Sequence, residues 1–444
     1  MKYYLALIST LVLTACGGGG GGGSAPAVQP RILSAVQISS AVDQNTMLAY
    51  QTAATLEVPS DTCLVNATSV KYPAEYLGKY PVPTYSGSTA LRNIPLGMNI
   101  VDNWAHGEGP NPNNEPGCRT DNRTEFINTL RRLRALGTSH VTIPLYVCIN
   151  NADQPDQPWP KASISDSDLI WIAQQTQAQG MRTRLILQVC SNDENNPHRM
   201  LTNYVNRDWM EKFFTSYKKF VLERAQVLDG YYEAMSVDWD DFNPNWTGLG
   251  DIRQRALTEL TAELRKIWHG KLWLINLWGE WTNIATMTNQ VDFVQIWLSH
   301  NLRFPASQQS SLTVADIQQG YTSIINSYKN QYKITVPVQY YIMAQSHSRF
   351  YEIGWVEDSG CWKHANPTML CSGENGVTTD FGLQAMGIEG ALRAISQQPA
   401  NNIESVAIMG YRLGDNLQPG YSFPNTARSI RNKPAEYLVY QWWH

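Results

Sequence analysis

The chain has 444 residues, of which 43% are hydrophobic and 16% charged, and its formal net charge at pH 7 is −4. This length can bury a large core, either in two or three ordinary domains or in one long αβ barrel. Because acids and bases are interspersed, the chain lacks the basic stripe that neutralises a phosphate backbone, and we expect no nucleic-acid partner. The 15 tryptophans and 22 tyrosines carry flat rings with a polar edge, which suit a core and also suit a sugar-binding surface.

The N-terminus has the pattern of an export signal. Met1 and Lys2 form a short basic region, an apolar run extends from Leu5 to Leu13, and Leu13-Thr14-Ala15-Cys16 has the small residues of a cleavage site. This segment resembles the lipobox of bacterial lipoproteins, which implies cleavage before Cys16 and diacylation of its thiol. The alternative is a plain secretory signal, but the glycine run that follows is a flexible tether of the kind that anchored proteins use. We therefore expect a lipid-anchored protein of the bacterial cell envelope, in a leaflet that the sequence does not specify.

The composition of the chain divides it into four parts. We predict a signal peptide over residues 1–15, an anchor cysteine and glycine-rich linker over 16–45, an N-terminal extension without clear periodicity over 46–90, and a barrel domain over 91–444. No window after the signal has about 20 uninterrupted apolar residues, so we expect no further membrane span.

Six of the seven cysteines lie beyond the anchor position, and an even number in an exported chain favours disulfide bonds. Cys361 and Cys371 flank a loop rich in turn-forming residues, and we expect them to pair. Cys148 and Cys190 each end a predicted strand, and those strands should be neighbours. The third pair follows only by exclusion: Cys63 with Cys118. Since no Cys-x-x-Cys occurs, we expect no zinc cluster. We also expect no other metal and no cofactor.

From residue 94 onward the chain alternates short apolar runs with amphipathic stretches. Four consecutive units of helix, glycine and strand follow a first strand, and the spacing then shortens. The predicted strands are Leu96–Val101, His140–Cys148, Arg184–Cys190, a short strand after Gly230, Leu272–Trp278, Val291–Leu298, Val336–Met343 and Ser405–Tyr411. The predicted helices are Thr124–Leu136, a helix capped by Ser165 that ends at Gly180, one through Trp209–Arg224, Asp251–His269, Val314–Tyr328 and Asp380–Ser396.

Repeated helix and strand units indicate right-handed parallel crossovers. Eight such strands fit a closed (β/α)₈ barrel (a TIM barrel) better than an open, doubly wound sheet. In such a barrel the C-terminal ends of the strands face the ligand.

Carboxylates follow several of these strand ends, whereas we find no Gly-x-Ser-x-Gly elbow, no phosphate-binding loop and no His-Glu-x-x-His. A single acid is more often a solvated or capping carboxylate, so the group carries more weight than its members. The acids are Asp102, Asp193, Glu194, Asp238, Asp240, Asp241, Glu280 and Asp415. The aromatic residues that we expect to bind a sugar beside them are Trp104, Trp239, Trp278, Trp281, Trp297 and Tyr411.

The end of the fourth strand is the strongest candidate for chemistry. Alternate residues of a strand face the same side, so Asp238 and Asp240 could both point into the barrel mouth while Trp239 turns away. We expect one of the two aspartates to donate a proton or stabilise charge, with Glu352 as its partner and Glu280 in reserve. His347, after the seventh strand, could bind substrate, although a satisfied or surface histidine is more common.

The region from Leu96 onward resembles a clan A glycoside hydrolase barrel. Tyr421-Ser-Phe-Pro, then Asn432-Lys-Pro-Ala-Glu-Tyr-Leu and Trp442, are similar to the closing segment of family 113-type mannanases. In those families an acid/base glutamate ends strand four and a nucleophilic glutamate ends strand seven. The resemblance carries the first role to Asp238 or Asp240, an aspartate in place of that glutamate. The seventh strand offers no acid through Gln345, and Glu352 is the nearest candidate.

The leading hypothesis is a lipid-anchored glycoside hydrolase, or hydrolase-like barrel, that cleaves a polysaccharide by carboxylate acid/base chemistry. A catalytically inactive, glycan-binding surface lipoprotein is the alternative, and a structural envelope lipoprotein is a third. Two unpaired acids about 5 to 5.5 Å apart would indicate retention and about 6.5 to 9.5 Å inversion. Acids all engaged by arginine would favour binding.

Replacing Cys16 with Ser should release the protein from membranes, because the thiol that would carry the lipid is gone. The measurement is fractionation of cells that express the wild type or the variant, with the intact mass of the mature wild type as a second readout. A wild-type mass with an unmodified Cys16 would contradict the prediction.

Overall fold

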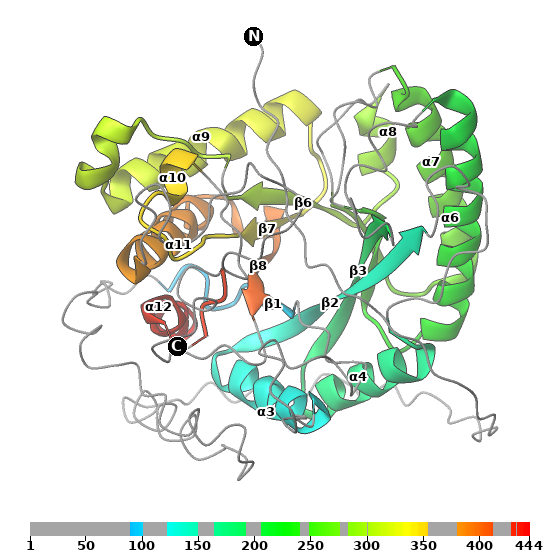
Figure 1. The fold of residues 1–444 in the computed structure, drawn as a ribbon, viewed down its shortest axis with the longest axis horizontal. Coiled ribbons are helices and arrows are strands. Elements are labelled where there is room, and N and C mark those ends of the chain that lie inside the picture. Colours follow the sequence, from blue (N-terminus) through cyan, green and yellow to red (C-terminus); the bar gives the residue numbers. More distant parts are fainter. Residues whose placement is uncertain are drawn as a thin grey trace.

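The computed structural model describes residues 89–100, 122–149, 164–191, 206–239, 248–275, 283–299, 301–353, 380–411, 428–431 and 433–444. Eight parallel strands form one closed barrel in the order β1 to β8, and β8 pairs with β1. Helices surround the strands on the outside (Figure 1). The closed (β/α)₈ barrel that the sequence predicts is therefore confirmed.

Strands and helices alternate along the chain, with one short helix, α8, between β5 and β6. The strands are β1 Leu96–Ile100, β2 Thr138–Ile149, β3 Arg182–Ser191, β4 Ala234–Trp239, β5 Lys271–Leu274, β6 Phe293–Leu298, β7 Val338–Ile342 and β8 Ile403–Tyr411. The helices are α3 Asn122–Ala135, α4 Asp166–Ala178, α6 Arg207–Leu228, α7 Gly250–Ile267, α8 Ile284–Thr288, α9 Val314–Tyr332, α10 Phe350–Ile353, α11 Phe381–Ser396 and α12 Pro434–Trp443, with 3₁₀ turns η4 Ala306–Ser311 and η5 Ala400–Asn402. Among the helices of the described ranges, none has the length and apolarity to cross a membrane.

Glycines end the helices that precede β2, β3 and β4, as predicted. Gly137, Gly180 and Gly230 have φ angles of 94°, 72° and 80°, which side chains rarely adopt. The fourth glycine acts differently, because α7 ends at Ile267 and Gly270 has no positive φ. A Cβ there would lie 2.8 Å from the carbonyl oxygen of Glu233, so close packing of backbones requires this glycine.

Apolar side chains form two layers on either side of the barrel wall. The outer layer packs the strands against the helices, and β6 contributes Val294, Ile296 and Leu298 to it. The inner cluster takes the alternate residues of the same strand, Phe293 and Trp297, with residues from the other strands. Strands with both faces buried explain the continuous apolar runs in the sequence.

Cys148 and Cys190 lie opposite each other in the β2–β3 ladder, which confirms that their strands are neighbours. Adjacent strands run about 4.8 Å apart, a spacing within the Cα range that a disulfide can bridge. The bond itself stays a prediction. Cys63, Cys118, Cys361 and Cys371 lie outside the described residues.

The last helix closes the barrel between its first and last strands. Glu436 of α12 accepts two hydrogen bonds from Arg132 of α3, at 2.8 and 2.6 Å, and a third from the Tyr411 hydroxyl of β8, at 2.7 Å. The indole N–H of Trp443 donates to the carbonyl oxygen of Ile94 at 2.9 Å, just before β1. This helix therefore holds both strands that meet at the seam.

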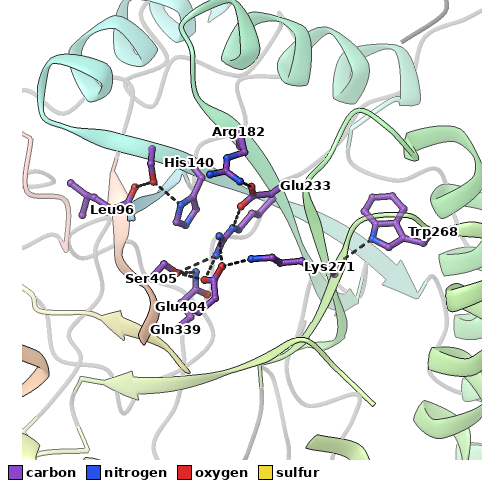
Figure 2. A network of polar contacts seen from close by, with 11 residues as sticks. Leu96, His140, Arg182, Glu233, Trp268, Lys271, Gln339, Glu404 and Ser405 are labelled. Atoms are coloured by element: carbon purple, nitrogen blue, oxygen red, sulfur yellow. Dashed lines mark hydrogen bonds and ion pairs between the residues drawn. The ribbon is translucent and has the colours of Figure 1, made fainter. Parts of the chain in front are cut away.

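A polar network fills the N-terminal end of the barrel (Figure 2). Arg184 of β3 donates from Nε to Glu233 at 2.6 Å and from both terminal nitrogens to Glu404 of β8 at 2.8 Å. Ser405 accepts from Arg184 and Gln339, and Lys271 also donates to Glu404. Arg184 is only 2% exposed, so these carboxylates compensate for the loss of its hydration.

Charge and burial shift the pKa values of this network in a consistent direction. Burial by itself would raise the pKa of Glu404, but Arg184 outweighs it and lowers that pKa to about 2. Burial, assisted by Arg184, Arg182 and Lys271 and opposed by Glu404, holds the pKa of His140 well below its ordinary value. The folded barrel thus keeps the carboxylate ionised and the imidazole neutral.

The free energy of unfolding should fall as the pH falls. Unfolded His140 gains a proton below about 6.5, whereas folded His140 does not, so stability declines below that pH. The contribution of Glu404 is complete above about 4.5 and is lost as the pH falls toward about 2. Replacing Glu404 with Gln should cost about 3 to 5 kcal/mol at pH 7 and flatten the curve between pH 4.5 and 2.

Urea unfolding followed by circular dichroism at several pH values measures both effects. Glu263→Gln is the matched control, because its carboxylate is 46% exposed on α7. Curves for Glu404→Gln and wild type that stay parallel below pH 4.5 would contradict the assignment.

Candidate functional site

All eight strands are parallel, so their C-terminal ends meet at one edge of the barrel. In (β/α)₈ enzymes this edge carries the active site, and the network of Figure 2 lies at the opposite edge, where side chains serve stability. The residues that end or follow β4, β5, β6 and β7 are therefore the ones to consider. Asp240 directly follows β4, and Glu280 comes later after β5, which ends at Leu274, but both acids lie outside the described residues.

Asp238 is buried in the barrel wall with a fixed set of partners. Its carboxylate is 1% exposed and accepts a 2.7 Å hydrogen bond on Oδ1 from the backbone N–H of Ile275. Its Oδ2 lies 3.4 Å from Nη2 of Arg253, which is equally buried on α7. A carboxylate that accepts on both oxygens suits the role of a fixed anion better than that of a proton donor.

Glu352 lies on the short helix α10, which follows β7. Arg349, one turn earlier, donates to its two oxygens at 2.8 and 2.5 Å. These hydrogen bonds lower the pKa of Glu352. Glu352 is thus held as an anion, the state that a nucleophile or a base requires. Both described candidate acids, Asp238 and Glu352, have an arginine partner, which is the arrangement expected for binding, whereas Asp240 and Glu280 lie outside the described residues.

Two aromatic residues that we expected to bind substrate, Trp239 and Tyr411, are buried beneath helices instead. Trp239 is 1% exposed and packs against Phe213 and Tyr217 of α6, with ring centroids 5.4 and 5.0 Å away. Tyr411 is also 1% exposed, and its hydroxyl donates to Glu436 of α12. Both rings lie between a strand and its covering helix, so neither offers a face to a sugar.

Among the aromatic residues that we expected to bind a sugar and that the structure describes, Trp297 lies inside the barrel. It belongs to the inner cluster near the C-terminal end of β6 and is 5% exposed. Its ring lies 5.0 Å from that of Tyr341 of β7, whose hydroxyl accepts a hydrogen bond from Asn99 of β1. The other candidates are outside the described residues: Trp104, Trp278 and Trp281.

A buried polar cluster follows β7, and the sequence pointed to only one of its members, His347. Gln345, Ser346 and His347 are all fully buried, as is Lys433 just before α12. Lys433 donates to the Ser346 hydroxyl at 3.1 Å. Nδ1 of His347 accepts from the backbone N–H of Arg349 at 3.3 Å, which places the proton of a neutral ring on Nε2. The polar run directly after an apolar strand was the available signal for this cluster.

The described residues contain no group of three or more histidine, cysteine or acidic side chains that could hold a metal ion. The described members of the candidate site include two carboxylates with their arginines and the rings of Trp297 and Tyr341. Such a set suits proton transfer and charge stabilisation on a neutral, hydroxyl-rich substrate.

The sequence matches no protein-family model and no curated protein. Among solved structures, the chain is similar to the GH113 β-mannanase AaManA from Alicyclobacillus acidocaldarius in complex with ManMIm, with a TM-score of 0.52 and 15% identity over 80% of this chain and 99% of that one. It is also similar to two structures of a GH113 β-1,4-mannanase, one of them a complex, each with a TM-score of 0.51 and 12% identity. These cover 78% and 79% of this chain and 97% and 98% of those chains. At this identity the likeness concerns the fold: the eight-stranded parallel barrel of this chain has GH113 clan A glycoside hydrolases as structural neighbours.

Proposed function

We propose that this chain is a lipid-anchored glycoside hydrolase that cleaves a polysaccharide at the C-terminal edge of its barrel. The observation that carries the proposal is the barrel itself, which spans 97% to 99% of the GH113 β-mannanases to which it is similar. Acids follow its strands at the edge where (β/α)₈ enzymes place their chemistry. A β-mannan is the first substrate to test, because those neighbours are β-mannanases.

The contacts of Asp238 favour Asp240 as the proton donor. Glycoside hydrolysis needs one carboxylic acid that protonates the leaving oxygen and a second carboxylate that attacks the sugar or activates water. Asp238 already accepts from Arg253 and Ile275, whereas Asp240 comes directly after the last residue of β4. Asp238 then acts as a fixed neighbouring anion.

Glu352 is the proposed second carboxylate, since Arg349 lowers its pKa and keeps it ionised. Glu280, after β5, is the reserve for this role. Two acids in different environments can divide the roles of proton donor and anion. Trp297, with Trp104, Trp278 and Trp281, would supply the rings on which sugar units stack.

Replacing the proposed acids should abolish cleavage without unfolding the protein. Asp240→Asn and Glu352→Gln should each lower kcat on the cleaved glycan by about 100- to 10,000-fold, since each removes an acid or an anion from the reaction. The measurement is release of reducing ends from β-mannan and from a panel of other polysaccharides, with mature protein in detergent. Glu263→Gln is the control with an exposed carboxylate.

Wild-type turnover in Asp240→Asn, Glu280→Gln and Glu352→Gln would refute the assignment of these residues. A wild-type protein that binds a glycan of the panel but cleaves none would refute hydrolysis and leave glycan binding as the function. A protein that neither binds nor cleaves any of them would refute the proposal as a whole.

A further inference from the structure

Strand β4 is irregular where it approaches the candidate site. Its ladder with β3 pairs Met235 with Leu185 and then Trp239 with Leu187, so two additional residues of β4 lie between these rungs. Such bulges redirect a strand and are common beside active sites. The irregular part is Ser236 to Asp238, immediately before the segment that carries Asp240.

Side chains replace the missing backbone hydrogen bonds of this bulge. The Ser236 hydroxyl accepts from the backbone N–H of Leu187 in β3 at 2.8 Å. On the other side of β4, backbone pairing with β5 extends to Ser236 and Trp273. Beyond that pair, the backbone N–H of Ile275 donates to the side chain of Asp238. The carboxylate thus ties the ends of β4 and β5 together.

Two helices hold the bulge from outside. Arg253 of α7 reaches the carboxylate of Asp238, and the Tyr217 hydroxyl of α6 donates to the carbonyl oxygen of Val237 at 3.2 Å. Burial lowers the pKa of Arg253 to about 9, against the opposing effect of Asp238, so the cation depends on this carboxylate for compensation. Trp239 packs on α6 and fixes the point at which the chain leaves the strand.

We propose that Arg253 is a positioning residue, which acts through Asp238 to fix the ends of β4 and β5, the strands after which Asp240 and Glu280 follow in the sequence. The inference rests on the proposed function, because those two acids are its candidates for catalysis. Arg253 is 1% exposed and therefore does not contact substrate. Its effect is on geometry: a displacement of about 1 Å at a reacting group can cost about 100-fold in rate.

The test compares two buried ion pairs at opposite ends of the barrel. Arg253→Met removes the cation near the candidate site, whereas Glu404→Gln disturbs the pair with Arg184 at the other end. Both variants of the mature protein are assayed in detergent, at a temperature at which both are folded. Arg253→Met should lower kcat about 10- to 100-fold with KM within about twofold, and Glu404→Gln should leave kcat within about twofold. Arg253→Lys should recover part of the loss, because it restores the charge without the planar fork.

Hydrogen exchange supplies a readout that needs no activity. The amide of Ile275 should exchange faster in Arg253→Met and in Asp238→Asn than in wild type, and at an unchanged rate in Glu404→Gln. Should Arg253→Met fail to fold, Tyr217→Phe removes the outer contact to Val237 and is expected to show the same pattern with a smaller loss of kcat.

The outcomes separate this proposal from the proposed function. A wild-type protein that cleaves no glycan refutes hydrolysis, and exchange at Ile275 then decides by itself whether Arg253 holds the junction of β4 and β5. Unchanged exchange in Arg253→Met, or a loss of kcat no greater than that of Glu404→Gln, overturns the positioning role.

Discussion

The ion pairs of Arg184 are the interaction on which the rest of the barrel depends. One guanidinium at the start of β3 joins Glu233, just before β4, to Glu404 of β8, and so links strands on different sides of the barrel. A buried guanidinium of this kind needs carboxylates that compensate its charge and accept its N–H groups, and Glu233 and Glu404 together accept from its Nε and both terminal nitrogens. When the sheet closes correctly, it therefore also brings Glu233 and Glu404 to the buried charge of Arg184.

The opposite end of the barrel uses the same chemistry for a different purpose. Arg253 of α7 and Asp238 also form a fully buried pair, and Asp238 lies in the bulge of β4, where backbone pairing is interrupted. Glu404 also lies where a ladder shifts register, between β7 and β8, but its pair closes the N-terminal end of the barrel, whereas Asp238 accepts the backbone N–H of Ile275 at the C-terminal end of β4.

Hydrophobic periodicity was enough to predict the barrel. Strands with both faces buried and helices stopped by glycine are local signals, and Ser165 caps α4 through Asp168 as its spacing indicates. Local sequence could not predict where individual aromatic residues lie. Trp239 and Tyr411 end their strands, but α6 and α12 cover them from 22 or more positions away in sequence, and nothing beside them in the chain reveals those partners.

The same limit applies to the acids. Asp238 and Asp240 look equivalent in the sequence, and only the approach of Arg253 and Ile275 distinguishes Asp238 as an anion with assigned partners. The alternation of inward and outward residues survives the bulge of β4, because two extra residues keep Met235, Val237 and Trp239 on the outer face, as was predicted for Trp239. Glu352 was identified from its position after β7, whereas its pairing with Arg349 depends on the turn of α10.

The closing helix α12 has a consequence for how the protein folds. Its contacts with Arg132 and with Ile94 join residues 304 and 349 positions apart, so they form only when almost the whole barrel sequence is available to fold. The pairing of β1 with β8 is equally long in range, and until it forms, an unpaired strand edge can pair with other chains. Contacts of such long range also slow folding. A chain in which the seam has not closed thus keeps a strand edge that can pair with other molecules, and it is most vulnerable to aggregation before β8 pairs with β1 and α12 packs over the seam.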